Sequence, residues 1–151
     1  LLFEKKYCLY VNSGSSALYI GVESFNFPKG SEIITPALTF STSIGCLIKN
    51  NLVPVFTDVE PLTYCIDCSQ IEKLISDKTV AILAPNLMGN LCNWPEIRKI
   101  ADKYNLIVIE DYKDKEKLID LENSDVGPIN ILKKINGKKI KSVEVLVKLE
   151  D

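Results

Sequence analysis

The turn Gly14-Ser15-Ser16 has residue types that could bind a phosphate group. It follows an apolar run, residues 7–11, and precedes a predicted helix. The backbone N–H groups at a helix N-terminus and the helix dipole suit an anion, and the serine hydroxyls can add to them. Serine before a helix is also a common N-cap. The spacing matches neither G-x-x-x-x-G-K-S/T nor G-x-G-x-x-G, so the turn by itself leaves both interpretations open.

A carboxylate closes the run "VIED", which is residues 108–111. Asp111 stands at the C-terminal end of a predicted strand, where ligands of open α/β sheets gather. A carboxylate at that edge could pair with a cationic group of a ligand, or it could only cap the next helix. The residue alone does not decide between the two.

Five cysteines and no histidine limit the available chemistry. Without imidazole, Cys/His zinc sites and Ser-His-Asp or Cys-His catalysis are excluded. An odd number of cysteines in a chain with a hydrophobic core predicts a reducing compartment, and hence a cytoplasmic protein. Cys65 and Cys68 form a C-x-x-C at a predicted helix start, where the helix dipole could lower a thiol pKa. We expect the spacing of Cys65 and Cys68 to be a coincidence, because a zinc site would need a second pair of ligands.

Size and charge point to one ordinary soluble domain. The chain has 151 residues, 46% of them hydrophobic, and a net charge of -2. These values support a single core and give no sign of nucleic acid or an anionic membrane surface as a partner. No apolar run is long enough to cross a bilayer.

Strand-like and helix-like stretches alternate up to residue 111. Near-continuous apolar strands such as "VAILAP" and "LIVIE" are typical of a parallel sheet covered on both faces, so the sequence predicts an α/β fold. Asp67 with Gln70 fits a capping box, and Pro95 fits the first turn of a helix. The predicted strands are Lys6–Val11, Glu32–Thr35, Val53–Val59, Val80–Pro85 and Leu106–Glu110, and the predicted helices are 15–26, 39–50, 68–76 and 95–104.

The composition changes after this alternation. Residues 113–151 are rich in charge, and their last part, 129–151, predicts a C-terminal β-hairpin with Asn136-Gly137 as its two-residue turn. We therefore divide the chain into residues 1–112 and a divergent charged tail, residues 113–151.

The ordered set "NSGSSALYIGV", "ALTFSTS", "APNLMGN" and "VIED" resembles the DegT/StrS-type family of sugar aminotransferases. The resemblance covers about residues 7–114. It implies fold type I of the pyridoxal 5'-phosphate (PLP) enzymes, with residues 1–112 as the N-terminal part of an incomplete large domain. The mostly parallel sheet flanked by helices agrees with that implication.

The resemblance assigns cofactor-binding roles to residues of two helix starts. Gly14, Ser15 and Ser16 match the family's phosphate-binding turn. Phe40, in "ALTFSTS", matches the aromatic residue that packs on the pyridine ring, although an ordinary core phenylalanine is the alternative.

Further roles follow from the family's other motifs. Asp111 matches the carboxylate that pairs with the protonated pyridine nitrogen, and Asp114 fits the position of a second polar contact to the cofactor. Asn86 stands where many relatives have histidine, so the resemblance implies either a substrate-lining residue or a turn. No residue is expected to hold a metal.

The resemblance ends before the family's Schiff-base lysine. That lysine forms the covalent bond to the cofactor and moves the proton during transamination. Lysines 133, 134, 138, 139, 141 and 148 do not stand in its sequence context, and the histidine that the dehydratase branch uses instead is also missing. No catalytic residue can therefore be named. Missing strands should also leave an unpaired sheet edge and an exposed apolar face.

The resemblance implies a function for the full-length relative. It would transfer an amino group from an amino-acid donor to a keto-sugar nucleotide, for polysaccharide or lipopolysaccharide assembly, and we expect it to be a homodimer. This chain would be a truncated or divergent form. Two alternatives stay open: a nucleotide-sugar 3-dehydratase relative, which "APNLMGN" and "EDYKD" permit, and a non-catalytic binding module with the 128–151 segment as an added edge.

Overall fold

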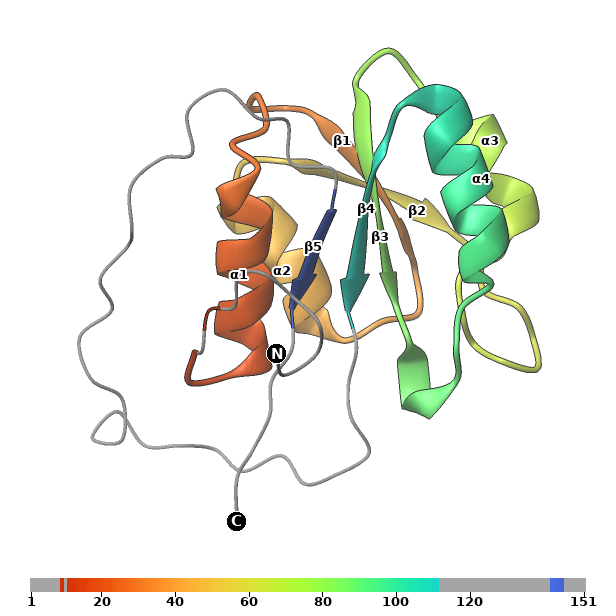
Figure 1. Cartoon of the computed structure of the whole chain (residues 1–151), viewed down its shortest axis with the longest axis horizontal. Coiled ribbons are helices and arrows are strands. Elements are labelled where there is room, and N and C mark those ends of the chain that lie inside the picture. The colour runs from red at the N-terminus through yellow and green to blue at the C-terminus, as the bar shows by residue number, and fades with distance from the viewer. Residues whose placement is uncertain (1–8, 10, 112–141, 146–151) are drawn as a thin grey trace.

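The structure, a computed structural model, describes residues 9, 11–111 and 142–145. The described part is a parallel sheet with helices on both faces (Figure 1). In chain order its elements are α1 (Gly14–Ser24), β1 (Glu32–Pro36), α2 (Ser41–Lys49), β2 (Val53–Thr57), α3 (Cys68–Leu74), β3 (Thr79–Pro85), the 3-10 turn η2 (Leu87–Gly89), α4 (Trp94–Tyr104), β4 (Ile107–Asp111) and β5 (Ser142–Val145).

All five strands run in parallel, in the order β2-β1-β3-β4-β5. The central strand β3 is buried over almost its whole length, as its apolar sequence predicted. β3 and β4 end level with each other, since Pro85 pairs with Asp111. The predicted α/β class is confirmed. The predicted strand Val53–Val59 is shorter in the structure and ends at Thr57.

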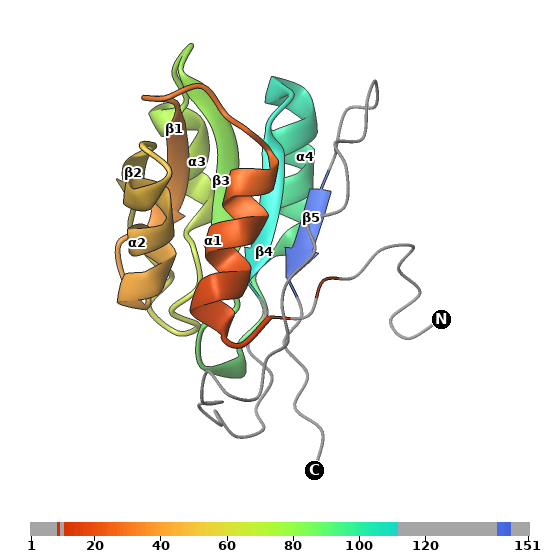
Figure 2. The ribbon, with the colours of Figure 1, turned by 90° about the vertical axis from the view of Figure 1, so that its left-hand side faces the viewer.

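Two cores lie on opposite faces of this sheet, and Figure 2 shows the helix pair over each face. Side chains alternate along each strand, so Ile109 of β4 packs under α1 and α2 whereas Val108 packs under α3 and α4. Leu47 of α2 and Ile97 of α4 are fully buried in the respective cores. This alternation determines which residues at the strand ends face α1 and α2.

The starts of α3 and α4 follow the predicted signals with one difference. Asp67 caps α3, and its Oδ1 accepts from the backbone N–H of Ser69 at 2.9 Å. In a capping box, Gln70 would reach back to the backbone N–H of the cap. Here that N–H donates to the Asp58 carbonyl, and the Gln70 amide donates to Asp67 Oδ2 instead. Pro95 lies in the first turn of α4, as predicted.

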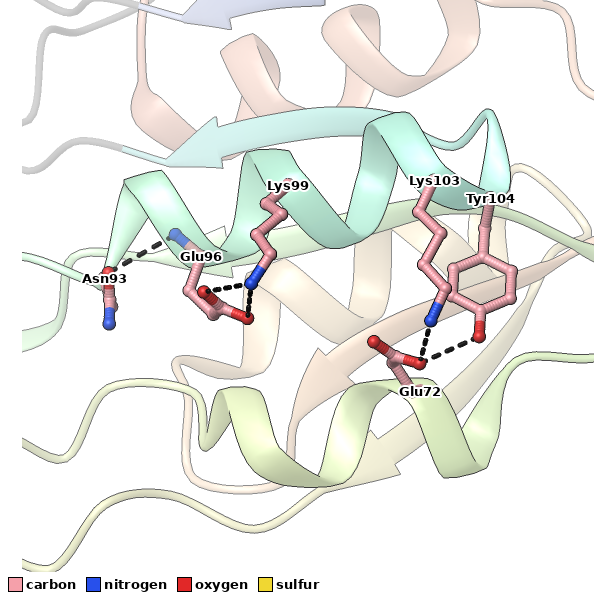
Figure 3. Close-up of polar contacts among 6 residues, drawn as sticks. All are labelled: Glu72, Asn93, Glu96, Lys99, Lys103 and Tyr104. Atoms are coloured by element: carbon pink, nitrogen blue, oxygen red, sulfur yellow. Dashed lines mark hydrogen bonds and ion pairs between the residues drawn. The ribbon is translucent and has the colours of Figure 1, made fainter.

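A polar contact joins α3 to α4 on the outer surface (Figure 3). Glu72 Oε2 accepts from Lys103 Nζ and from the Tyr104 hydroxyl, each at 2.8 Å. These two donors hold the pKa of the Glu72 carboxyl below its ordinary value. Lys99 and Glu96 form a second ion pair one turn apart on α4 itself, at 3.4 Å.

β2 and β5 are the edge strands of the described sheet, so β4 is not an edge strand. β5, from the tail, pairs with β4 over four residues, with Val145 opposite Asp111. The first arm and the turn of the predicted hairpin lie outside the described residues. So does the predicted strand Lys6–Val11, except for Leu9 and Val11, which are not in a strand. In the described part of the chain, no helix is both long enough and apolar enough to cross a membrane.

Candidate cofactor site

The start of α1 is both a helix cap and a source of spare N–H donors. The hydroxyl of Ser13 accepts from the backbone N–H of Ser16 at 3.2 Å, and the two side chains hydrogen-bond each other at 3.1 Å. The backbone N–H groups of Gly14 and Ser15 have no acceptor among the residues that the structure describes. Within the described residues, a Cβ added to Gly14 would meet no atom within 4 Å apart from its chain neighbours and its own helix backbone, so this part of the structure leaves space beside the turn. The turn can therefore present two amides and the Ser15 hydroxyl to an anion.

Phe40 stands immediately before α2 and is 54% exposed. Phe40 is therefore not part of either of the two described cores. A flat aromatic side chain that is half exposed at the carboxyl edge of a sheet can stack on a ligand ring. Its contact with the cofactor stays a prediction.

Asp111 is the last residue of β4, and its contacts include one through its carbonyl and one through its side chain. Its carbonyl accepts from the backbone N–H of Asn86 at 2.9 Å, and its Oδ2 accepts from the Ser43 hydroxyl at 3.4 Å. Asp111 lies two residues beyond Ile109, so its side chain projects from the same face of the sheet, toward α2. The pKa of the Cys46 thiol on α2 agrees with this direction, since burial and then the Asp111 charge raise it to about 12.

Asn86 is only 2% exposed, and both polar atoms of its side chain are bonded. Its amide Nδ2 donates to Glu110 Oε1 at 3.0 Å, and its Oδ1 accepts from the Cys92 backbone N–H at 2.9 Å. Asn86 therefore ties the end of β3 to the end of β4 and to the loop that leads into α4. These bonds give it a structural role, and the substrate-lining role stays a prediction.

A pocket of about 180 Å³ runs between α1 and α2 and begins beside the Ser15 turn. The two helices run side by side, and their N-termini lie at the same end of the sheet as Asp111 (Figure 2). The pocket is lined by Ser15, Tyr19, Ser41, Thr42, Gly45, Cys46 and Lys49.

The Gly14–Ser16 turn, Phe40 and Asp111 stand at the starts of α1 and α2 and at the end of β4, and their joint contact with a cofactor stays a prediction. Asp114 lies outside the described residues. Ser43 was missed, and nothing in the sequence signals it, because a serine in the first turn of a helix is unremarkable and Asp111 is 68 residues away. The donors present fit PLP: amides and hydroxyls suit a phosphate, an aromatic face suits a pyridine ring, and a carboxylate suits a protonated ring nitrogen.

The described residues offer little support for metal or thiol chemistry. None of their histidine, cysteine, aspartate or glutamate side chains form a group of three that could hold a metal ion. Cys65 and Cys68 are both buried, and burial is the main reason that the pKa of Cys68 rises to about 11. A thiol with a raised pKa is a poor nucleophile at neutral pH, so the structure favours coincidence for the C-x-x-C.

Comparison with known proteins matches most of the described chain. A sequence profile of the DegT/DnrJ/EryC1/StrS aminotransferase family covers residues 2–114. Lipopolysaccharide biosynthesis protein RfbH of Salmonella typhimurium is 41% identical over 128 residues, which are 74% of this chain and 29% of RfbH. The 3-oxo-glucose-6-phosphate:glutamate aminotransferase of Bacillus subtilis is 37% identical over 71% of this chain and 24% of its own length.

A solved structure supports the same relationship. E. coli GDP-4-keto-6-deoxy-D-mannose-3-dehydratase with bound hydrated PLP superposes with a TM-score of 0.67 and 36% identity. The match covers 72% of this chain and 29% of the dehydratase. The chain therefore spans less than a third of the length of each of these three relatives.

Proposed function

The chain belongs to the DegT/DnrJ/EryC1/StrS aminotransferase family, and from that premise we propose that it supplies the cofactor-binding N-terminal part of a PLP-dependent aminotransferase. The substrate would be a keto-sugar nucleotide and the donor an amino acid, in the assembly of a polysaccharide or lipopolysaccharide. The supporting observation is that two helix starts and one strand end carry groups whose chemistry suits a phosphate, an aromatic ring and a ring nitrogen, at one edge of the sheet.

Each of these groups has a defined task. The backbone amides of Gly14 and Ser15, which have no acceptor within the described part of the chain, would bind the phosphate together with the Ser15 and Ser16 hydroxyls. Phe40 packs on the ring, and the Asp111 carboxylate holds the proton on the ring nitrogen. PLP, when bound, withdraws electrons from the substrate carbon. The Asp111 charge keeps the ring protonated and thereby preserves that capacity.

Parts of the catalytic apparatus lie beyond these residues. Asp114 is proposed as a second polar contact to the cofactor, and the Schiff-base lysine would come from sequence C-terminal to the family match. A cytoplasmic homodimer is proposed for the full-length enzyme. The chain by itself should therefore bind PLP without forming a covalent bond to it.

A binding experiment on the chain tests this proposal. We expect PLP to quench the fluorescence of Trp94 or to change its own absorbance on binding, whereas pyridoxal, without the phosphate, should bind more weakly. Asp111→Asn should weaken PLP binding, and Asp102→Asn, a change to an acidic residue on the outer helix α4, should not. Equal affinity for PLP and pyridoxal would refute the phosphate role of the turn.

Borohydride reduction gives an independent check. It fixes a Schiff base as a stable adduct that mass spectrometry can locate. We expect no adduct that is specific to one lysine of this chain. An adduct confined to one lysine of the tail would show that the chain carries its own catalytic residue.

The second candidate is a sugar 3-dehydratase, and the similarity to the E. coli enzyme favours it as the alternative. Both reactions would use the same cofactor-binding residues, so the present residues do not separate them. The coding sequence downstream separates them: a lysine in the family's catalytic position supports transamination, and a histidine there supports dehydration.

A further inference from the structure

Cys65 and Cys92 are two free thiols that the fold brings together from different loops. Cys65 is 2% exposed in the loop after β2, and Cys92 is 5% exposed in the loop after β3. Both belong to the core between the sheet and the helices α3 and α4. Burial raises the pKa of the Cys92 thiol, and the Cys65 thiol raises it further through its charge and through a hydrogen bond. The two side chains are therefore in contact, although they stand far apart in the sequence.

Hydrogen bonds hold the two loops together at this contact. The Asn90 side chain donates to the Thr63 carbonyl at 2.8 Å and so ties one loop to the other, two residues from each cysteine. The Cys65 backbone N–H donates to the Thr63 hydroxyl at 3.2 Å. The Cys92 backbone N–H donates to Asn86 Oδ1 at 2.9 Å. The main chain at both cysteines is thus held where their side chains enter the same core.

Cys68 is the third cysteine of this core, and it is the partner that the C-x-x-C motif would give to Cys65. Its thiol donates to the Ile66 carbonyl at 3.9 Å. Its charge also raises the pKa of the Cys92 thiol, but less than Cys65 does and without a hydrogen bond. Among the residues that the structure describes, the three cysteines do not form a group that could hold a metal ion. The structure therefore favours the pair of Cys65 with Cys92 over the pair within the motif.

We propose that Cys65 and Cys92 form a redox-sensitive latch, in which hydrogen peroxide oxidises the two thiols to a disulfide that joins the loop after β2 to the loop after β3. One thiolate attacks a peroxide oxygen, which gives a sulfenic acid and a hydroxide ion. The second thiolate attacks the sulfenic sulfur, forms the S–S bond and releases another hydroxide ion. The two thiol protons convert both hydroxide ions to water, so the sulfurs lose two electrons and the peroxide gains them.

The latch is slow and does not depend on the proposed function. The raised pKa of the Cys92 thiol leaves little thiolate at neutral pH, which argues against a catalytic thiol but only slows its oxidation. We therefore expect the disulfide to form over hours rather than seconds, under prolonged exposure to peroxide. The two thiols lie on the α3 and α4 side of the sheet, whereas the Gly14–Ser16 turn and Phe40 stand at the starts of α1 and α2.

Peptide mapping of the oxidised chain tests the latch. The full chain is incubated with hydrogen peroxide, its remaining thiols are alkylated, and it is digested with trypsin for mass spectrometry. We expect a disulfide between the tryptic peptides 50–73 and 79–98, with fragmentation assigning it to Cys65 and Cys92. The disulfide closes a loop of about 27 residues, so the melting temperature should rise by at least about 5 °C and return to its former value with dithiothreitol.

Matched variants and an unfolded control make the test specific. Cys65→Ala and Cys92→Ala should each abolish the disulfide and the rise in melting temperature, whereas Cys68→Ala, a change in the same core, should keep both. The same oxidation in concentrated urea should give mixed pairings, because the fold no longer selects one pair.

The peptide map of the unsubstituted chain decides the question even where a core variant unfolds. A disulfide from Cys68 to either of the other two cysteines would overturn the inference. So would sulfinic acids without a disulfide, thiols that stay unchanged after a day in peroxide, or the same single disulfide in urea as in the folded chain.

Discussion

Replacing Asn86 with alanine should destabilise the fold strongly, because it removes two buried hydrogen bonds at once. The Cys92 backbone N–H would lose its acceptor inside the protein, and leaving a buried donor unpaired costs about 1–3 kcal/mol. The lost bond to Glu110 adds about 0.5–1.5 kcal/mol, since that half-buried carboxylate can recover water. We therefore expect a loss of about 2–4 kcal/mol in the free energy of unfolding.

Urea unfolding followed by Trp94 fluorescence measures this loss. For a folded unit of about 100 residues, 1 kcal/mol shifts the melting temperature by about 4–8 °C, so a thermal scan should show a decrease of at least about 8 °C. Asn90→Ala is the matched control in the same loop. It removes one bond, from Nδ2 to the Thr63 carbonyl at 2.8 Å, and it should cost about 1 kcal/mol.

Equal stability of Asn86→Ala and Asn90→Ala would refute this reasoning. It would mean that water reaches the Cys92 N–H, or that the loop rearranges at little cost. Asn86→Asp adds a separate check, because it keeps the oxygen that accepts from Cys92 but replaces the donor with a charge facing Glu110. It should be destabilised at neutral pH and should recover part of the loss in acid.

Three further predictions concern other contacts. Asp111→Asn should lower the pKa of the Cys46 thiol from about 12, because the negative charge that disfavours the thiolate is gone. Burial should still keep this pKa above that of an ordinary thiol. An NMR titration of labelled cysteine measures the pKa, and an unchanged value would contradict the contact between Asp111 and Cys46. Glu72→Gln should be less stable than the unsubstituted chain at pH 7 and equal to it in acid, because a carboxyl with a lowered pKa contributes stability above its unfolded-state pKa and loses it as the pH falls through the folded-state pKa. The difference should also shrink in high salt, since the ion pair of Glu72 with Lys103 is exposed. Urea unfolding at both pH values measures it, and a difference in stability that persists in acid would contradict the prediction. Ser13→Ala should cost about 1 kcal/mol through loss of the α1 cap, and Ser13→Asn should recover most of it; equal unfolding midpoints for the two variants would argue against the cap.

The α/β fold could be predicted from the sequence because the signals for its strands and helix caps are local. Apolar runs such as that of β3 and caps such as Asp67 depend on residues adjacent in sequence, so they can be identified without knowledge of the tertiary structure. The Gly14–Ser16 turn was ambiguous for the same reason: its cap is local, but its free amides matter only if a ligand is present.

Contacts between distant segments could not be predicted in this way. Ser43 meets Asp111 only because the first turn of α2 lies near the end of β4, and β5 pairs with β4 although its sequence predicts the arm of a hairpin. The burial of Asn86 was missed because an asparagine after a strand usually marks an exposed turn.

Two adjacent carboxylates at the end of β4 point to opposite faces of the sheet, and this has a consequence for the register of the strand. Glu110 faces Asn86, whereas Asp111 faces α2, so a shift of β4 by one residue would exchange the two acids between the faces of the sheet. The longer glutamate would then stand on the face of the sheet that α1 and α2 cover. The hydrogen bond from Asn86 to Glu110 forms when Glu110 is on the opposite face. This bond therefore favours the observed register of β4 over a register shifted by one residue.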